Sequence, residues 1–364
     1  MSKISTILNK RWKFYVNKKI DLLLLDDNYV EFKFSNLKYH LLFNEIYIYE
    51  SLKALILFLF YLKANKLSLY EIYLKIIISK FDPKIAIGHD KNGKIFLFKK
   101  LFPNKISVAY QFGYIFENYL SKEYKKISNK KVDYYFVFDE RSRDLLKKII
   151  TSKYIISGSV KANERCDWNK KRNMIYDVMF ISSFRPLKKE YKDFKLVKYY
   201  NDHDIFFIKT ISNFCKKNKL KFCIAFSSLR RDKISRDFFK EEKNYMESVS
   251  NNFLTTYLDS YSLAEKTNLC IGTFSNLAYE LLLSKKKVNV FYKNKKVGLQ
   301  FLNKNNSNFV FYSKNRAQVE NRIKSLLKMS HTQWKKKNNN FFKYNKYDYK
   351  NIRLKKLIIN EVKN

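Results

Sequence analysis

The sequence holds few of the residues that build disulfide frameworks, zinc sites and glycine-rich loops. Its 364 residues include four cysteines, four histidines, three prolines and six glycines. The cysteines are scattered without the CxxC spacing of a zinc site, and they are too sparse for a disulfide-stabilised secreted domain. We therefore expect no metal site and no disulfide framework, which suits a reducing cytosol.

Several signatures of catalysis and targeting are also absent. The sequence has no P-loop, no GxGxxG, no HExxH and no GxSxG, so NTPase, dinucleotide oxidoreductase, zinc-protease and serine-hydrolase functions lose support. The N-terminus, MSKISTILNKRWKF, lacks the apolar core of a signal peptide. The most apolar run, residues 54–62, is shorter than the roughly 20 residues that span a bilayer. We expect a cytoplasmic protein that binds at most peripherally to the inner face of the cytoplasmic membrane.

Acids are few relative to cations. The chain has 74 Lys and Arg against 33 Asp and Glu, a formal net charge of +41, which predicts an anionic partner such as nucleic acid, lipid head groups or phosphorylated substrates. Hydrophobic residues make up 46% and aromatic residues 17%, so the chain is expected to fold despite its charge. Lys, Asn, Ile, Tyr and Phe are all abundant, as an AT-rich genome would also produce. The charge therefore predicts the sign of the partner but not its identity.

The length and the order of apolar segments predict an α/β fold with two Rossmann-like domains that face a cleft. A chain of 364 residues exceeds one ordinary core, and buried strands, polar turns and helices alternate on both sides of the polar segment 161–173. We expect domains at 1–160 and 172–330. The expected strands cover 20–25, 39–43, 46–49, 84–87, 106–110, 132–138, 154–156, 176–181, 222–226, 268–271, 288–291 and 308–312. The expected helices cover 51–62, 68–80, 95–101, 142–149, 205–217, 261–265, 277–283 and 316–329, with Ser51 and Ser68 as N-caps.

The last segment, 331–364, is a basic tail interleaved with aromatic residues. That composition is typical of a membrane-surface or nucleic-acid contact. A terminal helix that packs on the N-terminal domain through Leu354, Leu357 and Ile358 explains the same residues equally well.

In the N-terminal half, polar residues stand where strands are expected to end. A carboxylate in a cleft can take a proton from an acceptor hydroxyl, and Asp90, beside His89, is the first choice for this general base. Asp26 is the second choice. Both acids also suit turns, as Asp does in many loops. Gly88, Gly113, Gly158 and Gly272 each lie near a strand end, where they either line a cleft or allow a tight turn.

In the C-terminal half, residues 268–292 read as strand, polar turn, helix and strand. The helix start carries Gly272, Thr273, Ser275 and Asn276, and free N–H groups with hydroxyls there favour a nucleotide phosphate. The alternative is that Ser275 or Asn276 merely caps a helix. The basic run 285–287 suits the end of that helix. The two preceding strands are followed by further phosphate candidates: Ser182, Ser183, Arg185, Ser227 and Arg230.

Asp202, His203 and Asp204 spell DxD, the metal-nucleotide motif of one glycosyltransferase architecture. They stand at the start of an expected helix, where acids act as caps and interact with the helix dipole. We therefore interpret both acids as capping residues.

The order of elements and several short motifs resemble known enzymes. The pattern G-T-x-S-N-x-x-x-E at 272–280 looks like that of GT-B glycosyltransferases. Segments 24–26, 45–50, 88–90, 96–103, 106–113, 156–159 and 161–163 are similar to a family of bacterial surface-carbohydrate biosynthesis proteins. In that family the strand-end residues are closer to Asp-Asn and Gln-Asn-Gly, whereas this chain has His89-Asp90 and Gln111-Phe112-Gly113.

The resemblance implies that the C-terminal domain holds a nucleotide-activated donor and the N-terminal domain an acceptor, without a metal or other cofactor. Thr273, Ser275 and Asn276 would hold the donor phosphate, and Glu280 a ribose hydroxyl. The acceptor side would include Gln111, Gly113, Gly158 and Ser159.

The function expected from these observations is glycosyl transfer, or transfer of a polyol phosphate, from a nucleotide-activated donor. The acceptor would be a growing surface polysaccharide such as capsule or lipopolysaccharide, or a lipid-linked glycan, and an anionic membrane surface would be a partner. Two alternatives remain open. One is a nucleic-acid-binding protein, for which the charge is the argument, and the other is a nucleotide-sugar epimerase on the same fold.

Overall fold

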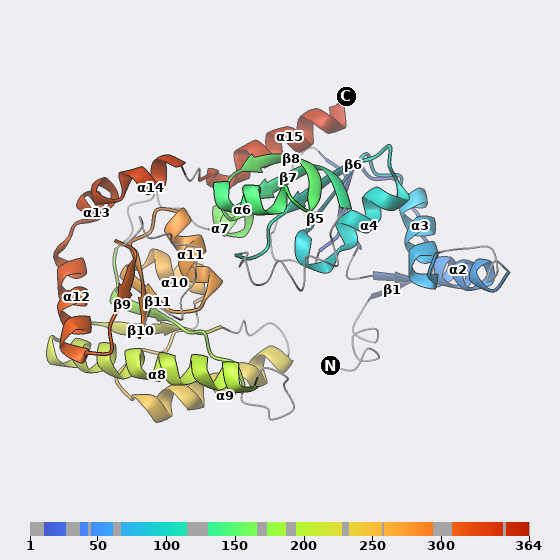
Figure 1. The fold of residues 1–364 in the computed structure, drawn as a ribbon. Helices are drawn as coiled ribbons and strands as arrows, with labels where there is room; N and C mark the ends of the chain where they lie inside the picture. Colours follow the sequence, from blue (N-terminus) through green and yellow to red (C-terminus); the bar gives the residue numbers. More distant parts are fainter. Residues whose placement is uncertain are drawn as a thin grey trace. The chain divides into compact units, whose positions relative to one another are not determined.

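The computed structural model describes residues 11–26, 37–42, 45–60, 67–114, 130–165, 173–186, 194–227, 233–256, 258–293, 308–344 and 347–363. The chain forms two compact units, one made of Met1–Glu164 with Asn351–Asn364 and the other of Arg165–Lys350 (Figure 1). The boundary between them lies inside the polar segment 161–173, but residues 161–165 are helical rather than a linker. The basic tail divides between the units instead of forming a part of its own.

The first unit is built on a six-stranded sheet in which every pair of neighbours is parallel. Its strand order is β3-β2-β5-β6-β7-β8. The strands are β2 (Leu22–Leu24), β3 (Tyr39–Leu41), β5 (Ile85–His89), β6 (Ile106–Tyr110), β7 (Lys130–Val137) and β8 (Ile150–Ile156). The chain adds β3 on one side of β2 and β5 on the other. The carboxyl ends of β2 and β5 therefore form the topological switch point, where ligands of open α/β sheets bind.

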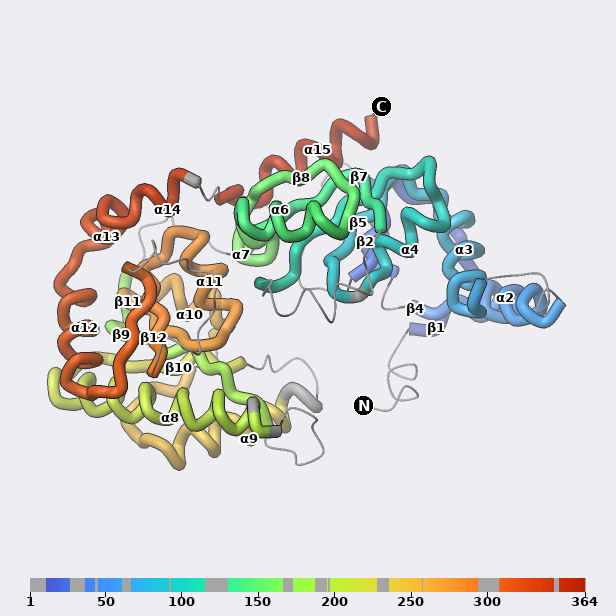
Figure 2. The backbone as a smooth tube through the Cα atoms, in the orientation of Figure 1, coloured from blue at the N-terminus to red at the C-terminus, as the bar shows by residue number. Residues whose placement is uncertain are grey.

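Helices cover both faces of this sheet because alternate strand residues point to opposite sides. Leu23 and Leu25 share one core with α3 (Leu69–Phe81), α4 (Lys94–Leu101) and α6 (Glu140–Leu146). Leu22 and Leu24 share the other core with α7 (Val160–Arg165) and α15 (Ile352–Lys363). The C-terminal helix thus covers a face of the first sheet (Figure 2), with Leu354 and Ile358 buried.

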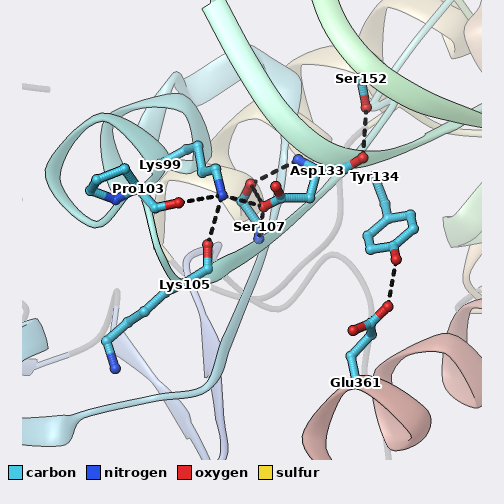
Figure 3. A network of polar contacts seen from close by, with 8 residues as sticks. All are labelled: Lys99, Pro103, Lys105, Ser107, Asp133, Tyr134, Ser152 and Glu361. Carbon is cyan, nitrogen blue, oxygen red and sulfur yellow. Dashed lines mark hydrogen bonds and ion pairs between the residues drawn. The ribbon is translucent and has the colours of Figure 1, made fainter. Parts of the chain in front are cut away.

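Polar contacts join strands β6 and β7 of the first unit to the helices on the two faces of the sheet (Figure 3). Lys99 of α4 lies 2.8 Å from the Asp133 carboxylate, which also accepts from the Ser107 backbone N–H and hydroxyl at 2.8 Å each. On α15, Glu361 accepts from the Tyr134 hydroxyl. These contacts tie the starts of β6 and β7 to α4, and β7 to the C-terminal helix.

The remaining elements of the first unit lie beside the sheet. A short strand β1 (Arg11–Lys13) pairs with β4 (Glu45–Tyr47), which leads directly into α2 (Ile48–Phe60). The Ser68 N-cap of α3 is confirmed, with a full capping box to Glu71. The prediction of Ser51 as an N-cap is wrong, because Ser51 lies inside α2 and its hydroxyl donates to the Tyr47 carbonyl. The 3₁₀ segment η2 (Asp90–Asn92) follows β5, and η5 (Tyr349–Asn351), where the chain returns to the first unit, precedes α15.

The second unit repeats the topology of the first. Its five strands are all parallel, in the order β10-β9-β11-β12-β13, so β9 and β11 form its switch point. The strands are β9 (Tyr176–Ile181), β10 (Phe222–Ala225), β11 (Thr267–Gly272), β12 (Val288–Tyr292) and β13 (Val310–Tyr312). The helices are α8 (Phe194–Lys217), α9 (Lys233–Val249), α10 (Ser260–Glu265), α11 (Asn276–Leu283), α12 (Arg316–Lys328), α13 (His331–Lys337) and α14 (Asn339–Tyr344). The predicted α/β class with two Rossmann-like units is confirmed.

Helices α8 and α9 of the second unit differ from expectation. Helix α8 begins at Phe194, so Asp202, His203 and Asp204 lie inside it, and their interpretation as capping residues is wrong. Helix α9 was not predicted from the sequence. Its buried side includes Glu242 between Phe239 and Met246. A charged residue on the inner face hides the apolar period of a helix.

The basic run 285–287 stabilises a different helix from the one expected. The Lys287 ammonium is buried and donates to the carbonyls of Leu326 at 3.1 Å and Met329 at 2.9 Å, at the end of α12. Burial lowers the pKa of Lys287 to about 8. A cation among terminal carbonyls is favourable at any helix C-terminus, and here the helix is one that follows Lys287 in the chain.

Candidate functional site

The switch point of the second unit brings two of the predicted polar segments together. Ile181 at the end of β9 is in register with Gly272 at the end of β11, so the residues that follow these strands meet at one sheet edge. The Ser183 and Thr273 hydroxyl oxygens lie 3.2 Å apart. Ser182 is buried beside them and accepts the Phe184 N–H at 3.1 Å.

Asp204 of α8 holds this edge together. One carboxylate oxygen accepts the Ser183 N–H at 2.9 Å and its hydroxyl at 2.7 Å, and the other accepts the Thr273 hydroxyl at 2.5 Å. Asp204 is 1% exposed, and burial raises its pKa to about 6 despite these hydrogen bonds. Since each hydroxyl has one proton, both protons point to Asp204 when its carboxylate is ionised. Asp204 therefore fixes the loops after β9 and β11 relative to each other.

The loop between β11 and α11 is further held by aromatic residues. The Phe274 ring packs on Tyr200 with centroids 4.3 Å apart and on His203 at 4.8 Å. The Tyr292 hydroxyl donates to the Thr273 carbonyl at 3.0 Å. His203 accepts the Lys293 N–H at 3.0 Å, and burial lowers its pKa to about 3, so the imidazole is neutral. Helix α8 thus packs against the loop between β11 and α11, the loop predicted to hold a phosphate.

The start of α11 has the geometry of an open helix N-terminus. Gly272 is required before it, because a Cβ there would lie 2.6 Å from the Ala278 Cβ. Ser275 occupies the N-cap position in extended conformation, but its side chain makes no capping hydrogen bond. Asn276 is the first residue of the helix. Ser275 is partly exposed at the start of this helix, and a helix N-terminus with a hydroxyl beside it is an arrangement suited to an anion.

Glu280 lies one turn further along α11, where it is buried and accepts the Tyr261 hydroxyl. Its assignment to a ribose hydroxyl stays a prediction. A ribose at this position would share the carboxylate with Tyr261.

The end of β10 repeats the arrangement seen at β9. The Ser227 N–H and hydroxyl both lie 3.0 Å from Glu242 oxygens, so a buried acid of the following helix again holds a strand-end serine. Arg185 is exposed, and its guanidinium donates to the Phe184 carbonyl at 2.7 Å. Arg230 lies outside the described residues. Asp204 and Glu242 are the residues that sequence reasoning missed, although the DxD pattern had drawn attention to Asp204.

The switch point of the first unit joins Asp26, after β2, to His89, the last residue of β5. One Asp26 oxygen accepts the His89 backbone N–H, and the other lies 3.5 Å from its Nε2. Both residues are buried, and burial, together with the charges of Lys91 and Lys94, lowers the pKa of His89 to about 4. The imidazole is therefore neutral at pH 7 and oriented by a carboxylate, as in many general bases.

Asp90 lies beside this pair but faces the next strands. It is buried, and its two oxygens accept the Phe112 N–H at 3.1 Å and the Tyr135 hydroxyl at 2.7 Å. These bonds join the ends of β5, β6 and β7. Asp90 as general base stays a prediction, and its hydrogen bonds equally suit a positioning role.

The predicted acceptor-side residues shape the ends of β6 and β8. The Gln111 amide donates to the Gly113 carbonyl at 2.9 Å and accepts the Phe138 N–H at 2.8 Å. Gly158 has a φ of 76°, which favours glycine, and the Ser159 hydroxyl accepts the Ala162 N–H at the start of α7. Their contact with an acceptor stays a prediction.

A cavity of about 630 Å³ lies elsewhere in the first unit. Its lining is basic and aromatic, with Lys94, Lys99, Lys100, Lys130 and Lys131 beside Tyr70 and Phe96, and it includes none of the predicted site residues. Within the described residues, no group of three or more His, Cys, Asp or Glu is placed to hold a metal ion. In the same residues, no helix has the length and apolarity needed to cross a membrane.

Comparison with known proteins identifies the family. Residues 111–362 match the model of a family described as "putative O-antigen biosynthesis protein". The chain belongs to this family. Its assignment to surface-carbohydrate biosynthesis agrees with the resemblance found in the sequence motifs.

Solved structures show the same fold at low sequence identity. One is the "putative UDP-N-acetylglucosamine 2-epimerase" of Listeria monocytogenes, 12% identical, with a TM-score of 0.51 and coverage of 80% of this chain and 79% of that one. Another is MnaA of S. aureus with UDP, also 12% identical with a TM-score of 0.51, covering 96% of both chains. The O-antigen family member therefore has a GT-B-like fold.

A curated relative, Protein Ycf2 of Physcomitrium patens, is 26% identical over 338 residues. The match takes in 82% of this chain but only 14% of the length of Ycf2.

Proposed function

We propose that this protein transfers a sugar or a polyol phosphate from a nucleotide-activated donor to an acceptor in the synthesis of a bacterial surface polysaccharide. The family supports the process, since its description is O-antigen biosynthesis. The acceptor would be a growing glycan or a lipid-linked glycan, and the reaction would need no metal ion. Neither the family description nor the fold specifies this reaction, so the proposal depends on the site in the second unit.

The observation that carries the proposal is the start of α11. It lies at a topological switch point, its Ser275 hydroxyl makes no capping bond, and Asp204 holds the preceding loop. A diphosphate would accept from Ser275 and the first N–H groups of the helix. The Ser183 and Thr273 hydroxyls would act through Asp204 rather than directly, because their protons are used there. UDP in the structure of MnaA supports a nucleotide as the ligand of this fold.

In the first unit, which would bind the acceptor, His89 would be the group that removes the acceptor proton. Its imidazole is neutral at pH 7, and Asp26 contacts both its ring and its backbone N–H. Asp90 would position the neighbouring strand ends. A neutral imidazole can accept a proton as the acceptor hydroxyl attacks, and Asp26 then stabilises the imidazolium that forms.

Calorimetric titration tests the donor site. UDP, CDP, GDP and CMP are titrated into the wild type, and the tightest binder into Ser275→Ala. Losing one hydrogen bond to a charged group costs about 1.5–3 kcal/mol, so affinity is expected to fall tenfold or more while stability stays unchanged. Ser248→Ala is the matched control, because Ser248 is exposed and its hydroxyl donates to the Tyr245 carbonyl within α9. Equal affinity of Ser275→Ala and Ser248→Ala would contradict the proposal.

Epimerisation of a nucleotide sugar is the second candidate. One solved structure with this fold is described as a putative UDP-N-acetylglucosamine 2-epimerase, which favours this alternative. An epimerase converts its substrate without an acceptor, whereas a transferase releases the nucleotide only when an acceptor is present. Product analysis of the bound nucleotide sugar, with and without an acceptor glycan, separates the two. Binding to nucleic acid would instead be recognised by a steep loss of affinity with salt.

A further inference from the structure

Helix α2 turns its apolar residues outward. Leu52 is 56% exposed, Leu59 is 57% exposed and Phe60 is 83% exposed, and Leu55 and Ile56 are exposed on the same helix. Its buried side carries Glu50 and Ala54. A surface helix of a globular protein normally has the reverse pattern. In Figure 2, α2 lies outside the six-stranded sheet, against α3.

Aromatic side chains of β1 and of the two residues after it extend this surface. Trp12, Phe14 and Tyr15 are all more than half exposed. They lie next to α2, because β1 pairs in parallel with β4 and the Tyr49 N–H donates to the Phe14 carbonyl at 2.9 Å. We call the exposed apolar residues of segment 12–15 and of α2 the apolar face. It comprises Trp12, Phe14, Tyr15, Ile48, Tyr49, Leu52, Leu55, Ile56, Leu59 and Phe60.

The exposed charges on residues 11–20 and on α2, the two segments that carry the apolar face, have one sign. Residues 11–20 include Arg11, Lys13 and Lys18, all exposed, and no acid. Lys53 is exposed on α2, and the one acid of that helix, Glu50, is fully buried with Lys80 at 2.7 Å. The charged side chains exposed on these two segments are therefore all cationic.

We infer that the first unit docks on an anionic lipid bilayer through the apolar face, with α2 lying in the plane of the interface. Aliphatic side chains would enter the acyl region, Trp and Tyr would occupy the head-group level, and the cations would meet anionic head groups. Thirteen residues make a helix too short to span the bilayer but long enough to lie along it. The inference does not depend on the proposed transferase reaction.

The same observations disfavour two other occupants. A second copy of the chain would place the cations of both copies face to face, because a two-fold interface pairs a surface with itself. A nucleic acid would neutralise the cations but leave the exposed leucine and isoleucine side chains in water. A bilayer surface matches both the apolar chemistry and the charge.

Vesicle sedimentation with the full chain tests the inference. The vesicles are neutral phosphatidylcholine alone or phosphatidylcholine with an anionic phosphatidylglycerol component. We expect binding to the anionic vesicles, and we expect Leu55→Gln/Leu59→Gln to bind at least tenfold more weakly, because two apolar side chains are lost from the contact. Lys13→Gln/Lys53→Gln is expected to reduce the preference for anionic vesicles while leaving residual binding to neutral ones.

The matched control is Leu254→Gln/Ile352→Gln, which changes two residues exposed to a similar degree, 47% and 46%, outside the apolar face. It is expected to bind like the wild type. Far-ultraviolet circular dichroism and thermal melting check folding, and Trp12→Gln/Phe14→Gln replaces the leucine variant if that variant does not fold. A wild type that ignores anionic vesicles, or a leucine variant that binds as tightly as the control, would overturn the inference. Loss of self-association in the leucine variant, without any vesicle binding, would make the face a contact between copies instead.

Discussion

Ser183 and Thr273 follow different strands, yet their hydroxyl oxygens lie 3.2 Å apart because both groups donate to Asp204. A buried carboxylate that accepts from two loops at once fixes the distance between them. The proposed donor site therefore depends on a residue of α8 that would not itself touch the nucleotide.

Replacing Asp204 should destabilise the second unit. Asp204→Ala leaves the Ser183 N–H and two hydroxyls buried without their acceptor, and each unsatisfied buried group costs about 1–3 kcal/mol. We expect the free energy of unfolding to fall by about 2–5 kcal/mol in denaturant titrations. Asp202→Ala on the same helix is the control, since that side chain is exposed. Equal stability of the two variants would show that the hydrogen bonds to Asp204 do not stabilise the fold.

Gly272 and Ala278 should behave as a coupled pair. A methyl group on Gly272 would lie 2.6 Å from the Ala278 Cβ, so Gly272→Ala forces α11 away from β11. Overpacking of this kind costs about 1–3 kcal/mol. The double variant Gly272→Ala/Ala278→Gly removes the clash, and its stability should exceed that of Gly272→Ala alone despite the glycine placed in a helix. A double-mutant cycle by chemical denaturation measures the coupling, which would be zero if the two residues were independent.

Acid should destabilise the fold through buried histidines. The pKa of His203 is about 3 in the folded protein against 6.5 for a free histidine, and that of His89 is about 4. The unfolded chain therefore binds more protons below pH 6.5. The stability that the two neutral histidines contribute is complete above pH 6.5 and is lost as the pH falls toward 4. Asp204 acts in the opposite direction, because its pKa is raised from 3.8 to about 6 and the folded state takes up its proton first.

His203→Gln isolates one contribution to this pH dependence. Gln can still accept the Lys293 N–H but does not titrate. Between pH 7 and pH 5 the loss of unfolding free energy should be smaller than in the wild type by about 2 kcal/mol, at roughly 1.4 kcal/mol per pH unit for one proton. Urea titrations at the two pH values measure the difference. An unchanged pH dependence would mean that His203 is protonated as easily in the folded state as in the unfolded one.

Kinetics of His89→Gln, Asp26→Asn and Asp90→Asn should separate a base from its positioning residues. Loss of a general base lowers the rate by about 10²- to 10⁴-fold, and we expect this for His89→Gln with little change in donor KM. Asp26→Asn should lower kcat and alter the acid limb of the pH profile, because the imidazolium loses its stabilising charge. If Asp90→Asn alone loses the full factor, the base is Asp90, as the sequence first indicated.

Local sequence was enough to determine the class of the fold and several of its details. Apolar runs ended by polar residues fix where buried strands stop, and parallel strands end at a common edge, so the positions of Ser183 and Thr273 in the chain predict that they share one site. Ser68 with Glu71 formed its capping box because both partners lie within one turn of chain. The same reasoning placed Asp26 and His89 among the candidates, since each follows or ends a buried strand.

Only the tertiary structure decided which distant groups meet. Asp204 lies in the middle of α8, and its partners come from two loops after other strands. Lys287 donates to carbonyls at the end of a later helix, and the Tyr49 N–H in the first turn of α2 donates to the Phe14 carbonyl after β1. No local period encodes such contacts, because they depend on the packing of segments that are far apart in the chain. Exposure also depends on the tertiary structure: the sequence shows an apolar helix in this region, and only the fold shows that Leu52, Leu55 and Leu59 are exposed.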